Sequence, residues 1–331
     1  MSDEALQNFI QRCREHDGDL ESKAGDDLRA STQAFLRATH REPELLTRAA
    51  ALLEGLPPAG AAWLALTFGT GVETGTDPAH TIPPLLACLE RWMDALPSFS
   101  SGDADANEEV LTPSAQQARL IEAFPLLCQS IVAHLARLPA ERERLARDAG
   151  LMDRLEQLST YSHGATWVRE ALLRTSGTLI VLHPPTEQGY ELGYENVANC
   201  FHLFSLVQVA IGAKLPGGRA PDNAVTAACR GKGMQTVNDQ AFWHYGDPYC
   251  ATPSLQGSVW GEATVRSLPV VEGVRVLLLW PPLLATRSWD SGFFGPHLEA
   301  LPSDISLRRR LTAEECASWM KRLGLERSAK T

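Results

Sequence analysis

The amino-acid sequence predicts an α+β protein, with a predominantly helical N-terminal half followed by a smaller mixed α/β part. In the first half, apolar residues recur every three or four positions, which is typical of amphipathic helices. After residue 176, short apolar runs rich in β-branched residues alternate with Gly and Pro, which is typical of strands joined by turns. We therefore expect a helical region over residues 1–176 and an α+β region over 177–331, packed together as one continuous unit.

Three segments of the first half carry the clearest helical pattern, namely 46–56, 82–96 and 115–138. Ser114 supplies a start signal for the third segment, and Pro125 is expected to kink it. Short connections that contain Pro or Gly join these helices. We therefore expect stacked helical hairpins of the kind found in α-solenoids, although the sequence has no repeat period.

Two segments of the first half are expected not to be helical. Residues 98–112 contain acidic but no basic side chains, so we expect a flexible acidic loop there. Residues 69–75, which read GTGVETG, partly match the glycine spacing of a dinucleotide-binding loop. Because no strand precedes them and Asp77-Pro78 follows, we interpret them as a flexible turn.

The second half begins with a predicted antiparallel hairpin. Its strands are 178–183 and 189–195, separated by two prolines and a polar turn. Residues 195–212 are apolar on nearly every side, which predicts a central buried helix after the hairpin.

A second hairpin is predicted farther along the chain. Residues 258–266 alternate between two faces, and 274–280 form an apolar, β-branched run. Glu272-Gly273 suits a tight turn between these two strands.

Composition limits the partners and the compartment. The 40 acidic and 30 basic residues give a net charge of −10, which opposes direct binding to nucleic acid. The seven cysteines never form a CxxC pair, which favours reduced thiols in a cytoplasm. The acidic N-terminus differs from a secretory signal, and no apolar run reaches the ~20 residues of a membrane-spanning helix. We expect an acidic cytoplasmic protein without cofactor or membrane partner, and the many Ala, Arg, Gly and Pro residues are compatible with a bacterial origin.

The segment 241–250, AFWHYGDPYC, is the first candidate site. His244, Asp247 and Cys250 could supply nitrogen, oxygen and sulfur ligands to a zinc ion. Their spacing matches no known metal motif, and aromatic residues beside a turn more often hold a loop onto a core. A structural loop is therefore the favoured interpretation, and metal binding is the weaker one.

His202 is the second candidate, because Glu195, Asn199 and His202 would share one face of the predicted helix. A carboxylate-bridged metal site needs Glu three residues before the His, and Asn199 stands there instead. We favour a structural histidine that is hydrogen-bonded to Asn199, Ser205 or the backbone.

A third candidate site combines residues on one predicted strand with residues that follow another. If the strand ends converge, an acid–base pocket could be lined by His244, Glu262, Arg287 and Asp290. The alternative is a set of exposed ion pairs with a structural role at most.

Aromatic and arginine residues concentrate in the same region, as they do at binding hot spots. The candidates for a binding surface are Trp243, Tyr245, Trp260, Arg266, Trp289 and Arg219.

The sequence contains none of the hydrolase, metalloprotease, P-loop or kinase signatures. The leading hypothesis is therefore a protein-interaction, scaffold or accessory protein that uses the Trp/Arg-rich surface of its C-terminal part to bind protein partners. The alternative is an enzyme, such as a metal-assisted or acid–base hydrolase, with its pocket in the C-terminal part. A component of a larger assembly and a small-molecule ligand both stay open.

Overall fold

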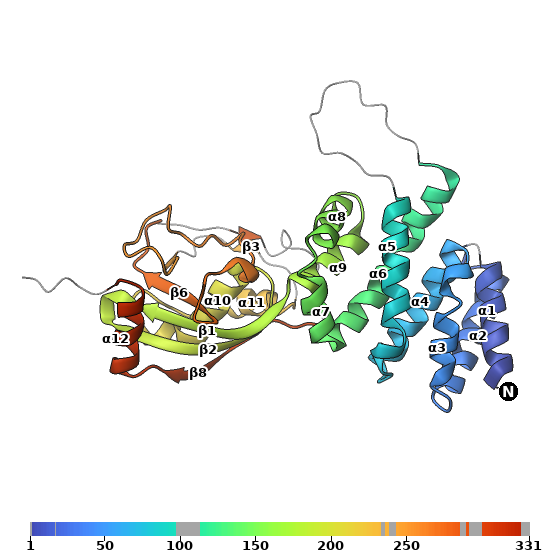
Figure 1. Cartoon of the computed structure of the whole chain (residues 1–331), viewed down its shortest axis with the longest axis horizontal. Helices are drawn as coiled ribbons and strands as arrows, with labels where there is room; N and C mark the ends of the chain where they lie inside the picture. The colour runs from blue at the N-terminus through green and yellow to red at the C-terminus, as the bar shows by residue number, and fades with distance from the viewer. Residues whose placement is uncertain are drawn as a thin grey trace, which may run out of the picture. The chain divides into compact units, whose positions relative to one another are not determined.

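The computed structural model describes residues 2–16, 18–96, 113–232, 236–237, 243–284, 289–290 and 300–325, with the backbone alone at 236–237 and 289–290. It divides into two compact units, Met1–Leu172 and Leu173–Thr331. The first is built of helices and the second of a mixed sheet with helices, which confirms the predicted α+β class (Figure 1). The predicted acidic loop at 98–112 lies outside the described residues.

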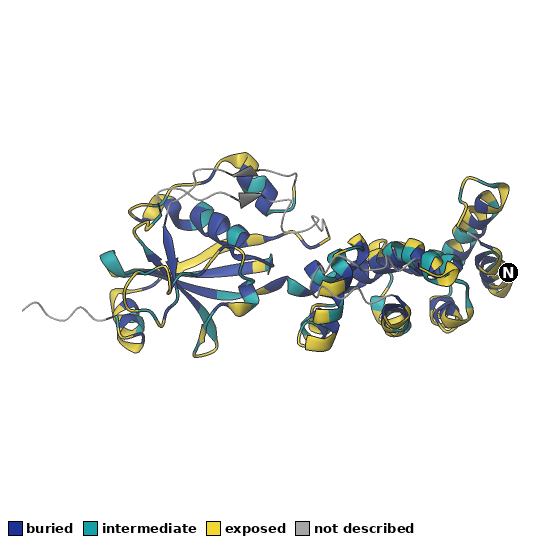
Figure 2. Cartoon of the chain, turned by 90° about the horizontal axis from the view of Figure 1, so that it is seen from above, coloured by how far each residue is buried: buried dark blue, intermediate teal, exposed yellow. Residues whose placement is uncertain are grey.

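The first unit is a series of helices that stand side by side, as predicted for stacked helical hairpins (Figure 1). Buried residues follow the sides that face neighbouring helices (Figure 2). The helices are α1 (Ser2–Glu15), α2 (Lys23–Thr39), α3 (Glu44–Ala50), α4 (Pro58–Glu73), α5 (Ile82–Ala95), α6 (Ala115–Arg137), α7 (Pro139–Leu145), α8 (Ala149–Ser159) and α9 (His163–Leu173).

The predicted turn at residues 69–75 is wrong, because most of this segment belongs to α4. Gly69 and Gly71 are buried inside the helix. A Cβ atom on Gly69 would lie 3.0 Å from the Cα atom of Ser130 in α6. The glycine thus allows α4 and α6 to pack closely, rather than providing a turn.

Helix α6 forms the centre of the first unit. Ser114 and Gln117 make a capping box at its start, as the sequence indicated, and Pro125 lies inside it. Among the described helices, α6 is the one long and apolar enough to cross a membrane, and 61% of its most apolar window is buried inside the protein. It also carries the buried His134, whose ring lies 2.7 Å from the hydroxyl of Thr81. These are properties of a core helix.

The second unit is organised around a mixed sheet with the strand order β4-β6-β1-β2-β8. The predicted first hairpin is confirmed by the antiparallel pair β1 and β2, and β1 pairs in parallel with β6 on its other side. The strands are β1 (Thr175–His183), β2 (Gln188–Val197), β4 (His244–Gly246), β5 (Val270–Val271), β6 (Val274–Trp280) and β8 (Asp304–Arg310). A separate two-stranded ribbon joins β3 (Thr236–Val237) to β7 (Trp289–Asp290).

Both faces of the main sheet are covered by apolar side chains. Helices α10 (Cys200–Ile211) and α11 (Asn223–Cys229) contribute to a buried cluster on one face. Helix α12 (Ala313–Arg322) packs on the other face, and Thr312 caps it with the predicted capping box. Strands β1, β2, β4 and β6 are therefore largely buried, whereas most residues of the edge strand β8 are exposed (Figure 2).

The predicted strand at 258–266 is wrong. Two isolated bridges involve this segment, Gly246 with Ser258 and Asn199 with Thr264. Instead, the carbonyls of Ala263 and Gly261 accept hydrogen bonds from the N–H groups of Cys200 and Phe201 at 2.8 and 3.0 Å. The segment thus satisfies the first turn of α10, whose N–H groups have no partner within the helix.

The turn at Glu272-Gly273 is confirmed, but it joins β6 to the two-residue strand β5. Both residues have positive φ angles, 51° and 82°, as a two-residue hairpin turn requires.

Candidate functional site

The loop that follows β4 is closed by Asp247. The Asp247 N–H donates to the carbonyl of Gly257 at 2.9 Å. Its carboxylate oxygen Oδ1 accepts a hydrogen bond from the Tyr249 N–H at 2.8 Å, and its carbonyl accepts one from the Cys250 N–H at 3.0 Å. This is ordinary Asx-turn chemistry, and it holds residues 247–257 as a closed loop at the border of the sheet.

The three candidate metal ligands of this segment have different environments. His244 is 1% exposed and pairs with Trp280 across β4 and β6. The carboxylate of Asp247 is engaged in the turn, and Cys250 is partly exposed. Within the described parts of the chain, no group of three or more His, Cys, Asp and Glu side chains is placed to hold a metal ion.

Trp243 and Tyr245 lie in the core and not on the surface, since each is 2% exposed or less. The Trp243 indole Nε1 donates to the carbonyl of Pro216 at 2.9 Å. The Tyr245 ring stacks on Phe204, with 3.6 Å between ring centroids, and its hydroxyl accepts a hydrogen bond from Gln208 Nε2 at 2.8 Å. These contacts hold the loop before α11 and the strand β4 onto α10.

His202 is 5% exposed and lies in the first turn of α10, which Asn199 caps. The backbone N–H of His202 donates to Oδ1 of Asn199 at 2.9 Å. The ring Nδ1 of His202 lies 3.3 Å from the side-chain amide nitrogen of Asn199. Glu195 is in β2 and not in α10, because the strand continues to Val197 and Asn199 caps the helix. The predicted single helical face of Glu195, Asn199 and His202 is therefore wrong.

The acid–base candidates are described to different extents. Glu262 lies exposed on the turn beside α10, whereas His244 is buried in the sheet. Arg287 lies outside the described residues, and Asp290 is described by its backbone, which pairs with Thr236. No described contact joins His244 to Glu262.

The residues predicted to form a binding surface also differ in how far their side chains are exposed. Trp260 is 45% exposed, and Arg219 is exposed on the loop before α11. Arg266 is half-buried in the turn that precedes β5. Trp289 is described by its backbone alone, in β7.

Exposed apolar side chains concentrate where β4 and β5 border β6. Tyr249 is 67% exposed, Leu255 50% and Val270 49%, values that are high for large apolar residues. We use the name edge patch for Tyr249, Leu255, Trp260 and Val270, of which Tyr249 and Val270 are joined by a hydrogen bond.

The backbone links the segments that carry the edge patch. Val270 pairs with Arg275 of β6, and Gly246 of β4 pairs with Leu278 on the same strand. The N–H of Val259 donates to the carbonyl of Tyr245 at 2.8 Å, which fixes the start of the turn that carries Trp260. Tyr249, Leu255 and Val270 were not among the residues predicted to form a site, although each is a large apolar residue beside turn or polar residues.

The cysteines differ in their potential reactivity. Burial raises the pKa of Cys13, Cys200 and Cys229 to about 12, and that of Cys88 to about 11. At neutral pH these thiols stay protonated and are poor nucleophiles.

No protein-family model, curated protein or solved structure matches the chain.

Proposed function

We propose that the protein is a non-catalytic interaction protein whose C-terminal unit binds a protein partner through the edge patch. One observation carries this proposal: four large apolar side chains of one sheet border are each at least 45% exposed. Contiguous apolar patches on the surface of a protein often mark sites of association.

The chemistry of the edge patch suits a protein surface. Tyr249 and Trp260 are of the residue types that dominate binding hot spots, and burial of apolar surface contributes about 25 cal/mol per Å². Their hydroxyl and indole N–H groups also allow hydrogen bonds at the rim of a contact.

Two arginines of the C-terminal unit are further candidates for contacts with the partner. Arg219 is exposed on the loop that Trp243 holds through the carbonyl of Pro216. Trp243 thus holds the loop that carries Arg219. Although Trp243 was predicted to lie on the binding surface, its proposed role is to position this loop. Arg266 follows the turn that carries Trp260.

Residue environments favour this proposal over acid–base catalysis. His244 is 1% exposed, so a substrate could reach it only after local opening of the sheet border. Glu262 is exposed on the turn beside α10, whereas a general acid or base must be held within hydrogen-bond reach of the reacting group.

Site-specific photo-crosslinking in cells of the source organism tests the proposal. We would place p-benzoylphenylalanine at position 249 or 255 and, as a control, at position 307. Leu307 is also an exposed apolar residue, 38% exposed, but it lies on β8 at the opposite edge of the sheet. We expect the same discrete protein adduct from 249 and 255 and none from 307. Identical adduct patterns at all three positions, or no adduct at any, would refute the proposal.

A further inference from the structure

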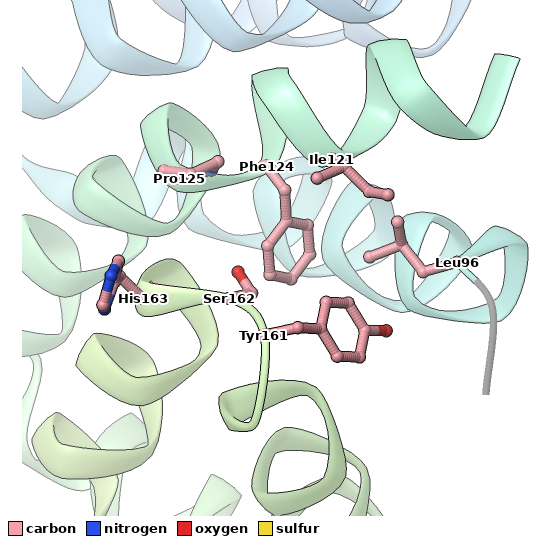
Figure 3. A pocket seen from close by; sticks show the side chains of 7 residues that line it. All are labelled: Leu96, Ile121, Phe124, Pro125, Tyr161, Ser162 and His163. Atoms are coloured by element: carbon pink, nitrogen blue, oxygen red, sulfur yellow. The ribbon is translucent and has the colours of Figure 1, made fainter. Parts of the chain in front are cut away.

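A cavity of about 110 Å³ lies in the helical unit, next to the proline of α6. The end of α5, the middle of α6 and the two residues before α9 surround it (Figure 3). Its apolar walls are the side chains of Leu96, Ile121, Phe124, Pro125 and Tyr161.

Pro125 removes one backbone hydrogen bond of α6 beside the cavity. Proline has no N–H, so residue 125 donates no hydrogen bond to the carbonyl of Ile121 one turn earlier. On the other side, a Cβ atom on Gly164 would lie 2.9 Å from the Cα atom of Pro125. The first turn of α9 therefore lies directly against α6, and the residues just before it line the cavity.

The polar group of this cavity is the hydroxyl of Ser162. Ser162 is 8% exposed, and its Oγ atom is buried without a hydrogen-bond partner. Figure 3 shows this oxygen directed toward α6, between Pro125 and Phe124. A serine just before a helix usually accepts a hydrogen bond from an N–H of the first turn, but Ser162 makes no such bond. Because buried hydroxyls nearly always have a partner, this one is free to bind a ligand.

We propose that this cavity binds a small uncharged molecule with an apolar ring or branched chain and one oxygen atom that hydrogen-bonds to Ser162. The volume is somewhat smaller than the ~150 Å³ of an engineered apolar cavity that admits benzene. Phe124 and Tyr161 provide aromatic contacts for a ring. The lining contains no Asp, Glu, Lys or Arg side chain, so a charged ligand would be buried without an ion-pair partner.

Methyl NMR of the full chain with phenol as the probe tests this proposal. The δ1 methyl of Ile121 lies in the cavity wall, and its NMR resonance should shift as phenol is added. The titration should give a millimolar dissociation constant, as expected for a ligand of so few atoms. Ser162→Ala should weaken phenol binding about 3- to 10-fold, the effect of one lost hydrogen bond, and should leave benzene binding unchanged.

Ser130→Ala is the matched control. The Ser130 hydroxyl is also buried without a partner and lies on α6, but it does not line the cavity. This variant should bind phenol as the wild type does. Ile121→Phe should abolish phenol binding by filling the cavity. If this variant does not fold, the titrations of the wild type and the two serine variants still test the proposal.

Two results would overturn the proposal. One is an Ile121 methyl that does not respond to phenol, which would indicate that the cavity holds water only. The other is equal phenol affinity in the wild type and Ser162→Ala. Neither result bears on the edge patch, which lies in the other unit.

Discussion

The hydroxyl of Tyr249 donates a hydrogen bond to the carbonyl of Val270 at 3.4 Å, which brings two of the most exposed apolar side chains of the C-terminal unit together. The two residues are 21 positions apart in the chain. They meet because β4 and β5 both pair with β6 on the side away from β1. This long-range contact places the edge patch at the border of the sheet.

Replacement of Trp243 and of Trp260 should separate a structural role from a surface role. Trp243→Ala should lower the free energy of unfolding by about 3–5 kcal/mol, because it leaves a cavity in the core. Trp260→Ala should change it by about 1 kcal/mol or less, since the side chain is 45% exposed. Urea titrations of both variants measure the difference, and equal losses would contradict the assigned environments.

Thiol labelling of the native chain should modify Cys250 first. It is the cysteine that is partly exposed, whereas the other six are buried. Burial also raises the pKa of Cys13, Cys88, Cys200 and Cys229. Mass spectrometry after a short treatment with iodoacetamide should therefore find one modified cysteine, and all seven after unfolding. Fast modification of Cys128, in the middle of α6, would contradict the packing of that helix.

The stability of the protein should fall as the pH decreases through about 6.5, the ordinary pKa of histidine. Burial lowers the pKa of His134 and of His183 in the folded state. Below the ordinary value, the unfolded chain therefore binds more protons than the folded chain, and unfolding becomes more favourable. Each histidine can contribute up to about 1.4 kcal/mol per pH unit.

His134→Gln isolates one of these contributions. The His134 ring donates from Nδ1 to the carbonyl of Ser130 and faces the Thr81 hydroxyl with Nε2, so the neutral form is the one that fits. Urea titrations between pH 7.5 and 5.5 should give a flatter pH dependence for this variant. An unchanged slope in His134→Gln would contradict the prediction.

Local sequence patterns correctly predicted the helices and strands whose conformation depends mainly on their own residues. The helix α6 followed from its periodicity and its Ser114 start signal, and the β1–β2 hairpin followed from two apolar runs around a turn. In contrast, α4 is buried on several sides, so its sequence has no polar face that would mark it as an amphipathic helix. Gly69 and Gly71 of α4 were therefore interpreted as part of a turn.

The sites depend on contacts that no local pattern encodes. The alternation of residues 258–266 predicted a strand, but hydrogen bonds to the first turn of α10 determine its conformation. The cavity near Pro125 requires residues of α5, α6 and the segment before α9 to meet. A single sequence shows the proline and Ser162, but it does not show that they lie side by side.

The most direct test of the central claim is the affinity of the crosslinked partner for three forms of the purified protein. These are the wild type, the double variant Tyr249→Ser/Val270→Ser, and the control Leu307→Ser. We predict at least about 10-fold weaker binding for the double variant, with wild-type affinity for the control, because hot-spot side chains supply most of the binding energy. Equal affinity of all three forms for the partner would contradict the assignment of the edge patch as the binding surface.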